Sequence, residues 1–407
     1  MRNILSVLSV TAVLLLPSGC SAFTSSAAYT DSSSAGFSPG VQDVVPGAWS
    51  TERYIEILKG KSVGVAANHT SLVTGKHLVD TLLTLGVDVR KIFTPEHGFR
   101  GTAGAGEYIE SGRDEKTGLP IISLYGSSRE PDAADLADLD ILVFDIQDVG
   151  VRFYTYISTL QLLMEGCAET GVKVLVLDRP NPNGHYVDGP VLDTAWSSFI
   201  GMQPVPVVYG MTIGEYALML NGEGWLAGGA GCDLEVIPCT GYSHKTPYDL
   251  PVPPSPNLPD RVAVQLYPSL CFFEGTDISV GRGTPFPFRV FGHPSLKEYP
   301  FAFTPRSVTA APSPPHMDRL CYGLDLSSAL YNGTLPSDRL SLEWLTDAYS
   351  NFPDKSSFFN SYFDRLAGSS ELREMIIAGK LPDEIRESWR SDLDRFLQIR
   401  KKYLLYD

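Results

Sequence analysis

The feature that most constrains the fold of this chain is an alternation of short apolar runs, polar loops and helical segments between Lys61 and Gly184. Segments 77–85 and 157–169 have the apolar spacing of helices. The apolar runs have the length of buried strands and lie at 62–67, 87–93, 119–124, 140–145 and 172–177. Mostly apolar strands that alternate with helices predict an α/β fold, in which a parallel sheet is covered by helices on both faces.

Polar side chains follow four of these strands. A ligand of such a sheet binds outside the carboxyl ends of its strands, so these strand ends predict a cleft. A helix N-cap or a turn can explain a single polar strand end. Four such ends, several with glycine or proline beside them, are harder to explain in that way. The candidate site residues at these ends are Asn68, Glu96, His97, Arg100, Asp145, Asp148, Arg152, Tyr154 and Asn181.

Two polar clusters are the strongest candidates for chemistry. In the loop 93–101, Glu96, His97 and Arg100 lie within five positions and beside two glycines. The segment 272–284 holds Glu274, Asp277 and Arg282 among further glycines. Several carboxyl groups in one cleft suit general acid–base or glycosidic chemistry, with Glu96 as the candidate acid. His97 is either a hydrogen-bond partner of that acid or of the substrate, or a packed structural residue.

The arginines of the cleft have two interpretations. Arg100, Arg152 and Arg282 can clamp a substrate carboxylate by paired hydrogen bonds. Each can equally hold a loop by pairing with a nearby aspartate, for example Asp145 or Asp148. The sequence leaves both interpretations open for each arginine.

Several other classes of protein are disfavoured. No G-x-G-x-x-G sequence joins the first strand to its helix, and no P-loop is present. The net charge of −15 argues against a nucleic-acid partner, because phosphate contacts need clustered lysine and arginine. Asp145, Asp148, His69 and His97 carry metal-binding atoms but lie in no ligand motif such as H-E-x-x-H. We therefore expect neither a metal nor another cofactor.

The first twenty residues predict an export signal. Arg2 supplies a positive start, and segment 4–16 is apolar but too short for a typical membrane span. The sequence PSGC that ends at Cys20 resembles a bacterial lipobox, in which the cysteine is acylated, although a leucine usually stands where Pro17 does. An ordinary secretory signal with an incidental cysteine is the alternative. We expect an exported bacterial lipoprotein, anchored to a membrane at the periplasm or the cell surface.

The chain of 407 residues is long enough for two folded domains. After the signal at 1–20, we expect a flexible Ser-rich tether at 21–45, a catalytic α/β domain at 46–260 and an α+β domain at 261–407. Amphipathic helices are predicted in the last domain at 340–349, 370–377 and 382–406. Apart from Cys20 the chain has five cysteines, an odd number, and a bridge between Cys232 and Cys239 remains open beside buried free thiols.

Long motifs carry a resemblance to a known family, and they extend from about Lys61 to the C-terminus. They are FTPEHGFRG (93–101), TGLP (117–120), FDIQDVGVRFYTY (144–156), LDRPNP (177–182), GMT (210–212), PSPN (254–257), FEGT (273–276) and GRGT (281–284). With these motifs the chain resembles the exo-β-N-acetylmuramidases of the NamZ type, which form glycoside hydrolase family 171 and were formerly a domain of unknown function.

The resemblance implies a Rossmann-like, doubly wound parallel sheet with a smaller α+β C-terminal domain, and an active site in the cleft between them. It implies a hydrolase that releases β-linked N-acetylmuramic acid from the non-reducing ends of peptidoglycan fragments in cell wall recycling. The substrate would be a disaccharide or muropeptide, and no cofactor is implied. Glu96 matches the family's P-E-H-G glutamate, the leading candidate for the general acid, and Glu274 matches the glutamate of the second motif.

Three points stay open in this interpretation. The second catalytic group is an enzyme nucleophile, a base or the substrate's own acetamido group. A lipid-anchored muropeptide-binding protein without catalysis would be expected to lose Glu96, which is present. A metal-dependent hydrolase on the same scaffold would be sensitive to a chelator. The sequence favours the glycosidase.

Overall fold

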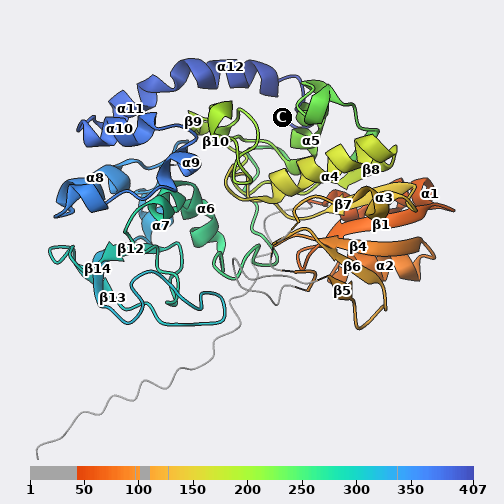
Figure 1. The fold of residues 1–407 in the computed structure, drawn as a ribbon, viewed down its shortest axis with the longest axis horizontal. Coiled ribbons are helices and arrows are strands. Elements are labelled where there is room, and N and C mark those ends of the chain that lie inside the picture. The colour runs from red at the N-terminus through yellow and green to blue at the C-terminus, as the bar shows by residue number, and fades with distance from the viewer. Residues whose placement is uncertain (1–43, 97, 101–110, 127, 337) are drawn as a thin grey trace, which may run out of the picture. The chain divides into compact units, whose positions relative to one another are not determined.

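A seven-stranded sheet of order β11-β8-β7-β1-β4-β6-β5 organises the first half of the chain. In this computed structural model, residues 44–96, 98–100, 111–126, 128–336 and 338–407 are described. Neighbouring strands are parallel except for the edge pair β5 and β6 (Figure 1). The strands are β1 (Ser62–Ala67), β4 (Asp88–Thr94), β5 (Gly112–Arg113), β6 (Pro120–Ser123), β7 (Ile141–Asp145), β8 (Lys173–Leu177) and β11 (Leu234–Ile237).

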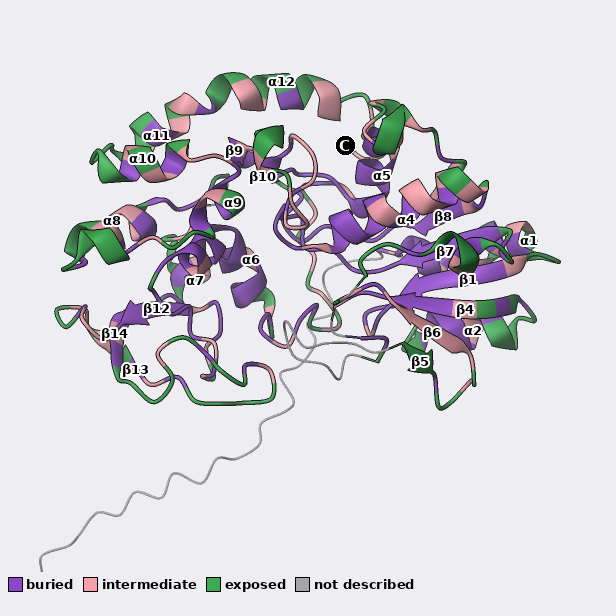
Figure 2. Ribbon diagram, in the orientation of Figure 1, coloured by how far each residue is buried: buried purple, intermediate pink, exposed green. Residues whose placement is uncertain are grey.

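The two faces of this sheet bury two separate cores. Val63 and Val65 of β1 belong to one core, while Ala66 of the same strand belongs to the other. Helices cover both faces, with α1 (Thr51–Leu58) and α2 (Leu78–Thr84) on the first, and α3 (Ala133–Leu136), α4 (Tyr156–Thr170) and α5 (Ile213–Gly222) on the second. Successive residues of a strand point to opposite faces of the sheet. When helices cover both faces, the residues on each face must therefore be apolar. The predicted doubly wound α/β fold is confirmed, and purple strands in Figure 2 show its burial.

The order of the strands reverses at β1. The chain moves outward from β1 through β4 to β6, and then returns to the other side of β1 for β7, β8 and β11. Loops on the two sides of such a reversal run apart and leave a crevice at the carboxyl ends of the strands. The segments after β4 and β7, which carry the candidate residues, both leave the sheet at this edge.

The C-terminal part combines helices with a small antiparallel sheet of order β12-β14-β13. Its strands are β12 (Val290–His293), β13 (Phe301–Phe303) and β14 (Cys321–Asp325). Its helices are α6 (Arg261–Leu270), the 3-10 turn η4 (Cys271–Gly275), α7 (Ala329–Asn332), α8 (Glu343–Asn351), α9 (Phe363–Ala367), α10 (Glu371–Ile377), α11 (Pro382–Ser388) and α12 (Arg390–Arg400). This mixture agrees with the α+β character that we expected there.

Shorter elements connect these two parts. They are the hairpin strands β2 (Leu72–Val73) and β3 (Lys76–His77), the pair β9 (Asp188–Val191) and β10 (Pro206–Val208), and the 3-10 turns η1 (Gly47–Trp49), η2 (Thr194–Trp196), η3 (Ala227–Gly229) and η5 (Lys355–Ser357). One buried core runs from the second face of the sheet into α6, α8, α9 and α12. Residues 43–407 pack as a single compact unit, and the boundary at 260 and 261 stays a prediction.

The predicted helix over 382–406 is broken in the structure. Helix α11 ends at Ser388, α12 begins at Arg390, and the last residues after Arg400 are not helical. Trp389 stands at the break, where its side chain is buried and its indole N–H donates to Asp188 Oδ1 at 3.3 Å. The break therefore coincides with a contact to a distant strand, which local periodicity does not contain.

The described part of the chain has five cysteines, all buried and free. Cys232 and Cys239 are therefore not bridged here, and burial raises the pKa of both thiols. No described helix has the length and apolar character needed to cross a bilayer. The signal at 1–20, the tether up to residue 43 and Cys20 lie outside the described residues.

Candidate active site

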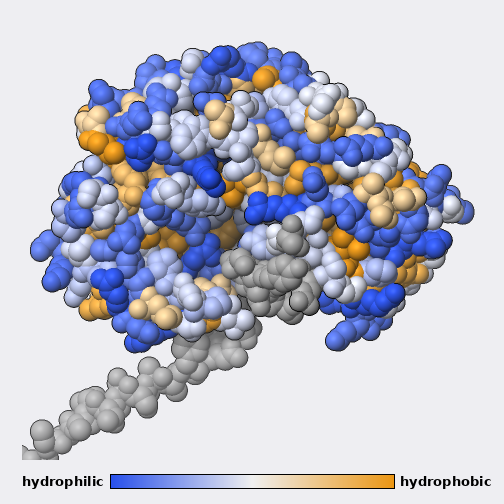
Figure 3. Space-filling view, viewed as in Figure 1, coloured by the Kyte–Doolittle hydropathy of each residue, from blue (hydrophilic) through white to orange (hydrophobic). Residues whose placement is uncertain are grey.

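A cavity of about 720 Å³ is lined by residues from both halves of the chain. The sheet half contributes loops that follow β4 and β6, the start of α4 and the segment after η2, and the C-terminal half contributes α6, η4, α9 and a proline-rich loop. The surface in Figure 3 is hollowed near the middle of the view. The lining residues are Glu96, Tyr125, Arg129, Phe153, Thr155, Ser198, Phe199, Ile200, Tyr267, Glu274, Arg282, Ala310, Ala311, Pro312, Ser313, Pro314, Pro315, Tyr362 and Arg365.

Glu96 lies directly beyond β4 and its carboxyl group reaches this cavity. The Tyr125 hydroxyl, from the loop after β6, donates to Glu96 Oε1 at 3.1 Å. Burial and the adjacent Glu96 charge raise the pKa of Tyr125 to about 12, so the phenol remains a donor at neutral pH. The Glu96 backbone oxygen lies 3.5 Å from the Tyr156 hydroxyl. The side chain and the backbone of Glu96 are thus both oriented by tyrosines.

Glu274 enters the cavity from η4, on the C-terminal side. Arg282 Nε donates to Glu274 Oε1 at 2.7 Å, and the Cys271 thiol lies 3.6 Å from Oε2. Burial of the Arg282 guanidinium opposes its charge, but the Glu274 carboxylate outweighs this effect and the pKa of Arg282 is raised. The guanidinium also lies over the Phe288 ring, at 5.0 Å from the centroid. Of the three predicted arginines, Arg282 is the one that lines the cavity.

Several lining residues were not predicted from the sequence. Arg129 lies over the Phe199 ring at 4.4 Å, and Arg365 is presented by α9. Tyr362 also borders the cavity, and burial followed by the nearby Cys271 and Glu274 charges raises its pKa. Tyr125 could have been found, because it follows the strand predicted at 119–124 directly. Tyr362 and Arg365 lie in a segment with no motif, and only the packing of α9 against η4 brings them here.

Asp145 and Arg152 lie away from the cavity lining. Arg179 donates to both oxygens of Asp145, at 2.5 and 2.9 Å, and this ion pair is fully buried. The Arg152 guanidinium is also fully buried, and it donates to the carbonyl oxygens of Pro190, Val205, Leu366 and Ala367. Burial lowers the pKa of Arg152 to about 9. In this structure both side chains hold segments together.

Three further candidate residues form hydrogen bonds or ion pairs with neighbouring protein groups. Arg100 makes a two-bond ion pair with Asp114, at 3.0 and 2.8 Å. Asn181 donates to the Met211 carbonyl oxygen at 2.8 Å. Asp148 accepts from Gly150 N at 2.6 Å and from the Tyr209 hydroxyl, and burial raises its pKa to about 7. None of the three lines the cavity described above.

Asn68 and Tyr154 do not line the main cavity but contact residues or cavities beside it. Asn68 Nδ2 donates to the Tyr156 hydroxyl at 2.9 Å, and that hydroxyl contacts the Glu96 backbone. Tyr154 borders a smaller cavity that also contains Glu96 and Arg282, and its hydroxyl donates to the Pro254 carbonyl at 2.7 Å. His97 lies outside the described residues.

The metal-binding atoms weighed in the sequence do not gather into a site among the described residues. Asp145 is taken by Arg179, and His69 Nε2 lies 2.8 Å from the Pro253 carbonyl oxygen. A different described group, Asp277, His293 and His316, has three ligand atoms close together. It does not line the cavity.

The arrangement defines a class of enzyme. Two carboxyl groups, aromatic side chains and guanidinium groups surround an open cavity at the carboxyl edge of an α/β sheet. A pair of carboxyl groups in a cavity lined by aromatic and polar side chains is typical of glycoside hydrolases.

Comparison with known proteins gives the family. The N-terminal and C-terminal models of the family described as exo-beta-N-acetylmuramidase NamZ match residues 63–262 and 265–406. A peptidoglycan beta-N-acetylmuramidase NamZ from Bacillus subtilis (strain 168) is 38% identical over 372 residues, which is 87% of this chain and 89% of that protein. The chain therefore belongs to the NamZ family of exo-β-N-acetylmuramidases, and it is a glycoside hydrolase.

Solved structures agree with this fold. A DUF1343 family protein from Bacteroides fragilis NCTC 9343 superposes with a TM-score of 0.84 and 49% identity, over 90% of this chain and 99% of that one. A second DUF1343 family protein from the same organism gives a TM-score of 0.76 and 29% identity, over 89% of this chain and 99% of that one.

Proposed function

We propose that this protein removes terminal β-linked N-acetylmuramic acid from the non-reducing ends of peptidoglycan fragments. The observation that supports this function most strongly is the cavity that presents Glu96 and Glu274 from opposite halves of the chain. Most glycoside hydrolases use an acid and a second carboxylate that flank the glycosidic bond.

Glu96 is the proposed general acid. It protonates the glycosidic oxygen as the bond to the anomeric carbon breaks, and it then takes a proton from the incoming water. The Tyr125 hydroxyl, 3.1 Å from Oε1, orients the carboxyl group for this transfer. The match of Glu96 to the P-E-H-G motif of the family supports the same role.

Glu274 suits an electrostatic role. Its carboxylate is held by Arg282 at 2.7 Å, which fixes its position and stabilises its negative charge. A fixed negative charge stabilises the positive charge that develops on the sugar ring in the transition state. If Glu274 is instead the covalent nucleophile, a glycosyl adduct on it would be detected by mass spectrometry of the trapped enzyme.

Arg129 and Arg365 give the cavity its selectivity in this proposal. Both guanidinium groups line the cavity, and N-acetylmuramic acid carries a lactyl carboxylate that N-acetylglucosamine lacks. A guanidinium binds a carboxylate by two parallel hydrogen bonds. Their presence favours a muramide over an uncharged sugar.

The test is hydrolysis of a chromogenic β-N-acetylmuramide by the full-length protein and by Glu96→Gln, with the corresponding β-N-acetylglucosaminide beside it. We expect release from the muramide alone, a loss of kcat of roughly a hundredfold or more in the variant, and an unchanged kcat at saturating substrate after chelation. Muropeptide binding without release by the intact protein would refute the enzyme and leave a receptor. Loss of kcat on chelation would instead indicate a metal-dependent hydrolase.

We also propose export and lipid anchoring at Cys20. The support is the sequence alone, namely the apolar segment 4–16 and the small residues before Cys20. Labelled palmitate should be incorporated into the native protein and not into Cys20→Ser, and this variant should leave the membrane fraction. Equal labelling of both proteins would contradict this assignment.

A further inference from the structure

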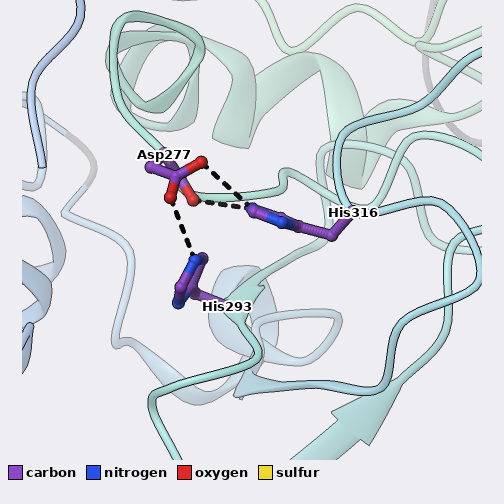
Figure 4. Close-up of side chains that lie close together, drawn as sticks. All are labelled: Asp277, His293 and His316. Atoms are coloured by element: carbon purple, nitrogen blue, oxygen red, sulfur yellow. Dashed lines mark hydrogen bonds and ion pairs between the residues drawn. The ribbon is translucent and has the colours of Figure 1, made fainter. Parts of the chain in front are cut away.

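A second group of reactive side chains lies outside the cavity. Asp277 follows η4, His293 is the last residue of β12, and His316 belongs to the loop between β13 and β14. Figure 4 shows both imidazole rings beside Asp277, with His293 at its carboxylate and His316 at both its carboxylate and its backbone carbonyl oxygen. Among the described residues, these three each offer one ligand atom, and the three atoms lie within 4.8 Å of one another.

The chemistry of this group is that of a transition-metal site. His293 Nε2 lies 3.1 Å from Asp277 Oδ2, and His316 Nε2 lies 3.5 Å from Oδ1. Two imidazole nitrogens and one carboxylate oxygen are a common ligand set for Zn²⁺ and related dications. The two histidine side chains are at most 10% exposed, whereas that of Asp277 is 49% exposed, so water can complete the coordination from one side.

Neighbouring groups contact both imidazole rings in the present arrangement. His293 Nδ1 accepts from Ser295 N at 3.1 Å and lies 2.6 Å from Ser295 Oγ. With Nε2 bound to a metal, Nδ1 would carry the ring proton and donate a hydrogen bond to Ser295 Oγ instead. His316 Nε2 lies 2.7 Å from the Asp277 carbonyl oxygen and would turn from it toward the carboxylate. Arg319 Nη1 lies 3.5 Å from His316 Nδ1 and can only donate to it, so Nε2 of a neutral ring carries the proton here and would release it on binding a metal. The thiol of buried Cys321 faces the Arg319 carbonyl at 3.7 Å.

The backbone beside His316 is unusual. His316 and Asp318 have φ values of 56° and 62°, which place two non-glycine residues of one loop in the left-handed region. Such conformations persist where surrounding contacts hold them, and they gather at functional sites. Here the strained loop is the one that delivers His316 to Asp277.

The group also joins two walls of the active-site cavity. Pro314 and Pro315, which line the cavity, directly precede His316, and Glu274 lies three residues before Asp277. We propose that Asp277, His293 and His316 bind a divalent transition-metal ion, which fixes the proline-rich wall against the segment that carries Glu274. The ion is a positioning element, because none of the three residues lines the cavity. Metal binding does not depend on the proposed function, and only its effect on KM rests on it.

Zn²⁺ is the probe that tests the site. Full-length protein is freed of metal with a chelator, dialysed and titrated calorimetrically with ZnCl₂, and Co²⁺ is added separately as a spectroscopic probe. We expect one Zn²⁺ per chain, a rise in Tm with Zn²⁺ concentration, and visible absorption from Co²⁺ bound to nitrogen and oxygen ligands. With the chromogenic muramide, removal of the metal should raise KM severalfold and leave kcat within about twofold.

Two variants and one control decide the assignment. Asp277→Asn keeps the shape of the side chain, and His316→Asn keeps a residue type that tolerates the left-handed backbone. Both should weaken Zn²⁺ binding at least roughly tenfold, whereas His185→Gln, at an exposed histidine outside the group, should bind as the native protein does. Unchanged affinity in both variants, or native protein with no heat of binding and no Co²⁺ absorption at millimolar metal, would overturn the proposal. If a variant fails to fold, the Co²⁺ spectrum of the native protein still decides it.

Discussion

At the scale of single residues, the nearest partner decides what each charged side chain does. Glu96 and Asp145 both follow apolar strands and look alike in the sequence. Glu96 reaches the cavity and meets a tyrosine hydroxyl, while Asp145 is closed off by Arg179. The sequence offered both interpretations for the arginines, and the choice between them depends on distances that local sequence does not contain.

Asp148 gives a prediction about pH at this scale. Burial raises the pKa of its carboxyl group to about 7 in the folded protein, from 3.8. The folded state therefore retains a proton that the unfolded state releases, and the resulting stability is present below pH 4 and lost as pH rises to about 7. Asp148→Asn should remove this part of the pH dependence, up to about 4 kcal/mol in the free energy of unfolding.

Urea unfolding of both proteins between pH 4 and pH 8 measures this difference. Part of the dependence of the free energy of unfolding on pH remains in the variant, because burial also raises the pKa of Asp178 to about 6. Glu298→Gln, at an exposed carboxyl group, is the control and should follow the native curve. A variant curve parallel to the native one over the whole range would contradict the assignment.

At the scale of elements, periodicity predicted the strands and failed where a distant contact intervenes. The five predicted strands are present, and none of their ends shifts by more than one residue. The last predicted helix is broken at Trp389, whose indole N–H donates to Asp188 of β9. Helix α6 was not predicted, and neither was the small sheet β12-β14-β13, whose short strands between loops leave a weak periodic signal.

Arg152 links several of these elements. Its guanidinium joins the end of β9 and the segment before β10 to the end of α9, through four carbonyl oxygens. A lysine ammonium is a compact charge and cannot reach all four. Arg152→Lys should lower the free energy of unfolding by about 3 kcal/mol, because buried carbonyl groups lose their donors.

The measurement is the urea midpoint of the variant at neutral pH. Arg90→Lys, in an ion pair whose arginine side chain is 51% exposed, is the matched control and should change stability by less than about 0.5 kcal/mol. A stability of Arg152→Lys equal to that of Arg90→Lys would show that the four contacts are not essential.

At the scale of the whole molecule, the last residues of the chain bond to the sheet half. The Tyr406 hydroxyl donates to Asp178 Oδ2 at 2.6 Å and accepts from Cys239 N at 2.8 Å. Leu405 N donates to Glu215 Oε1 at 2.7 Å. Residues that follow the last helix therefore satisfy buried polar groups of the sheet half.

Tyr406→Phe tests these contacts. Loss of the hydroxyl leaves the Asp178 carboxylate and the Cys239 amide without this partner, and we expect about 2 kcal/mol of lost stability with a Tm lower by a few degrees. Tyr331→Phe makes the same chemical change at a ring that is 75% exposed, and its Tm should equal the native value. Equal Tm values for the two variants would mean that the Tyr406 hydroxyl adds no stability.

The sequence by itself determined the α/β class, the strands and the family, because apolar periodicity and long motifs are local properties of the chain. It also placed Glu96, Glu274 and Arg282 among the candidates that line the cavity. Only the tertiary structure separated these residues from Asp145 and Arg152, and only it brought Arg129 and Arg365 to the same cavity. The physical reason is that a side chain's role depends on burial and on partners far away in the chain, which are decided when the two halves pack together.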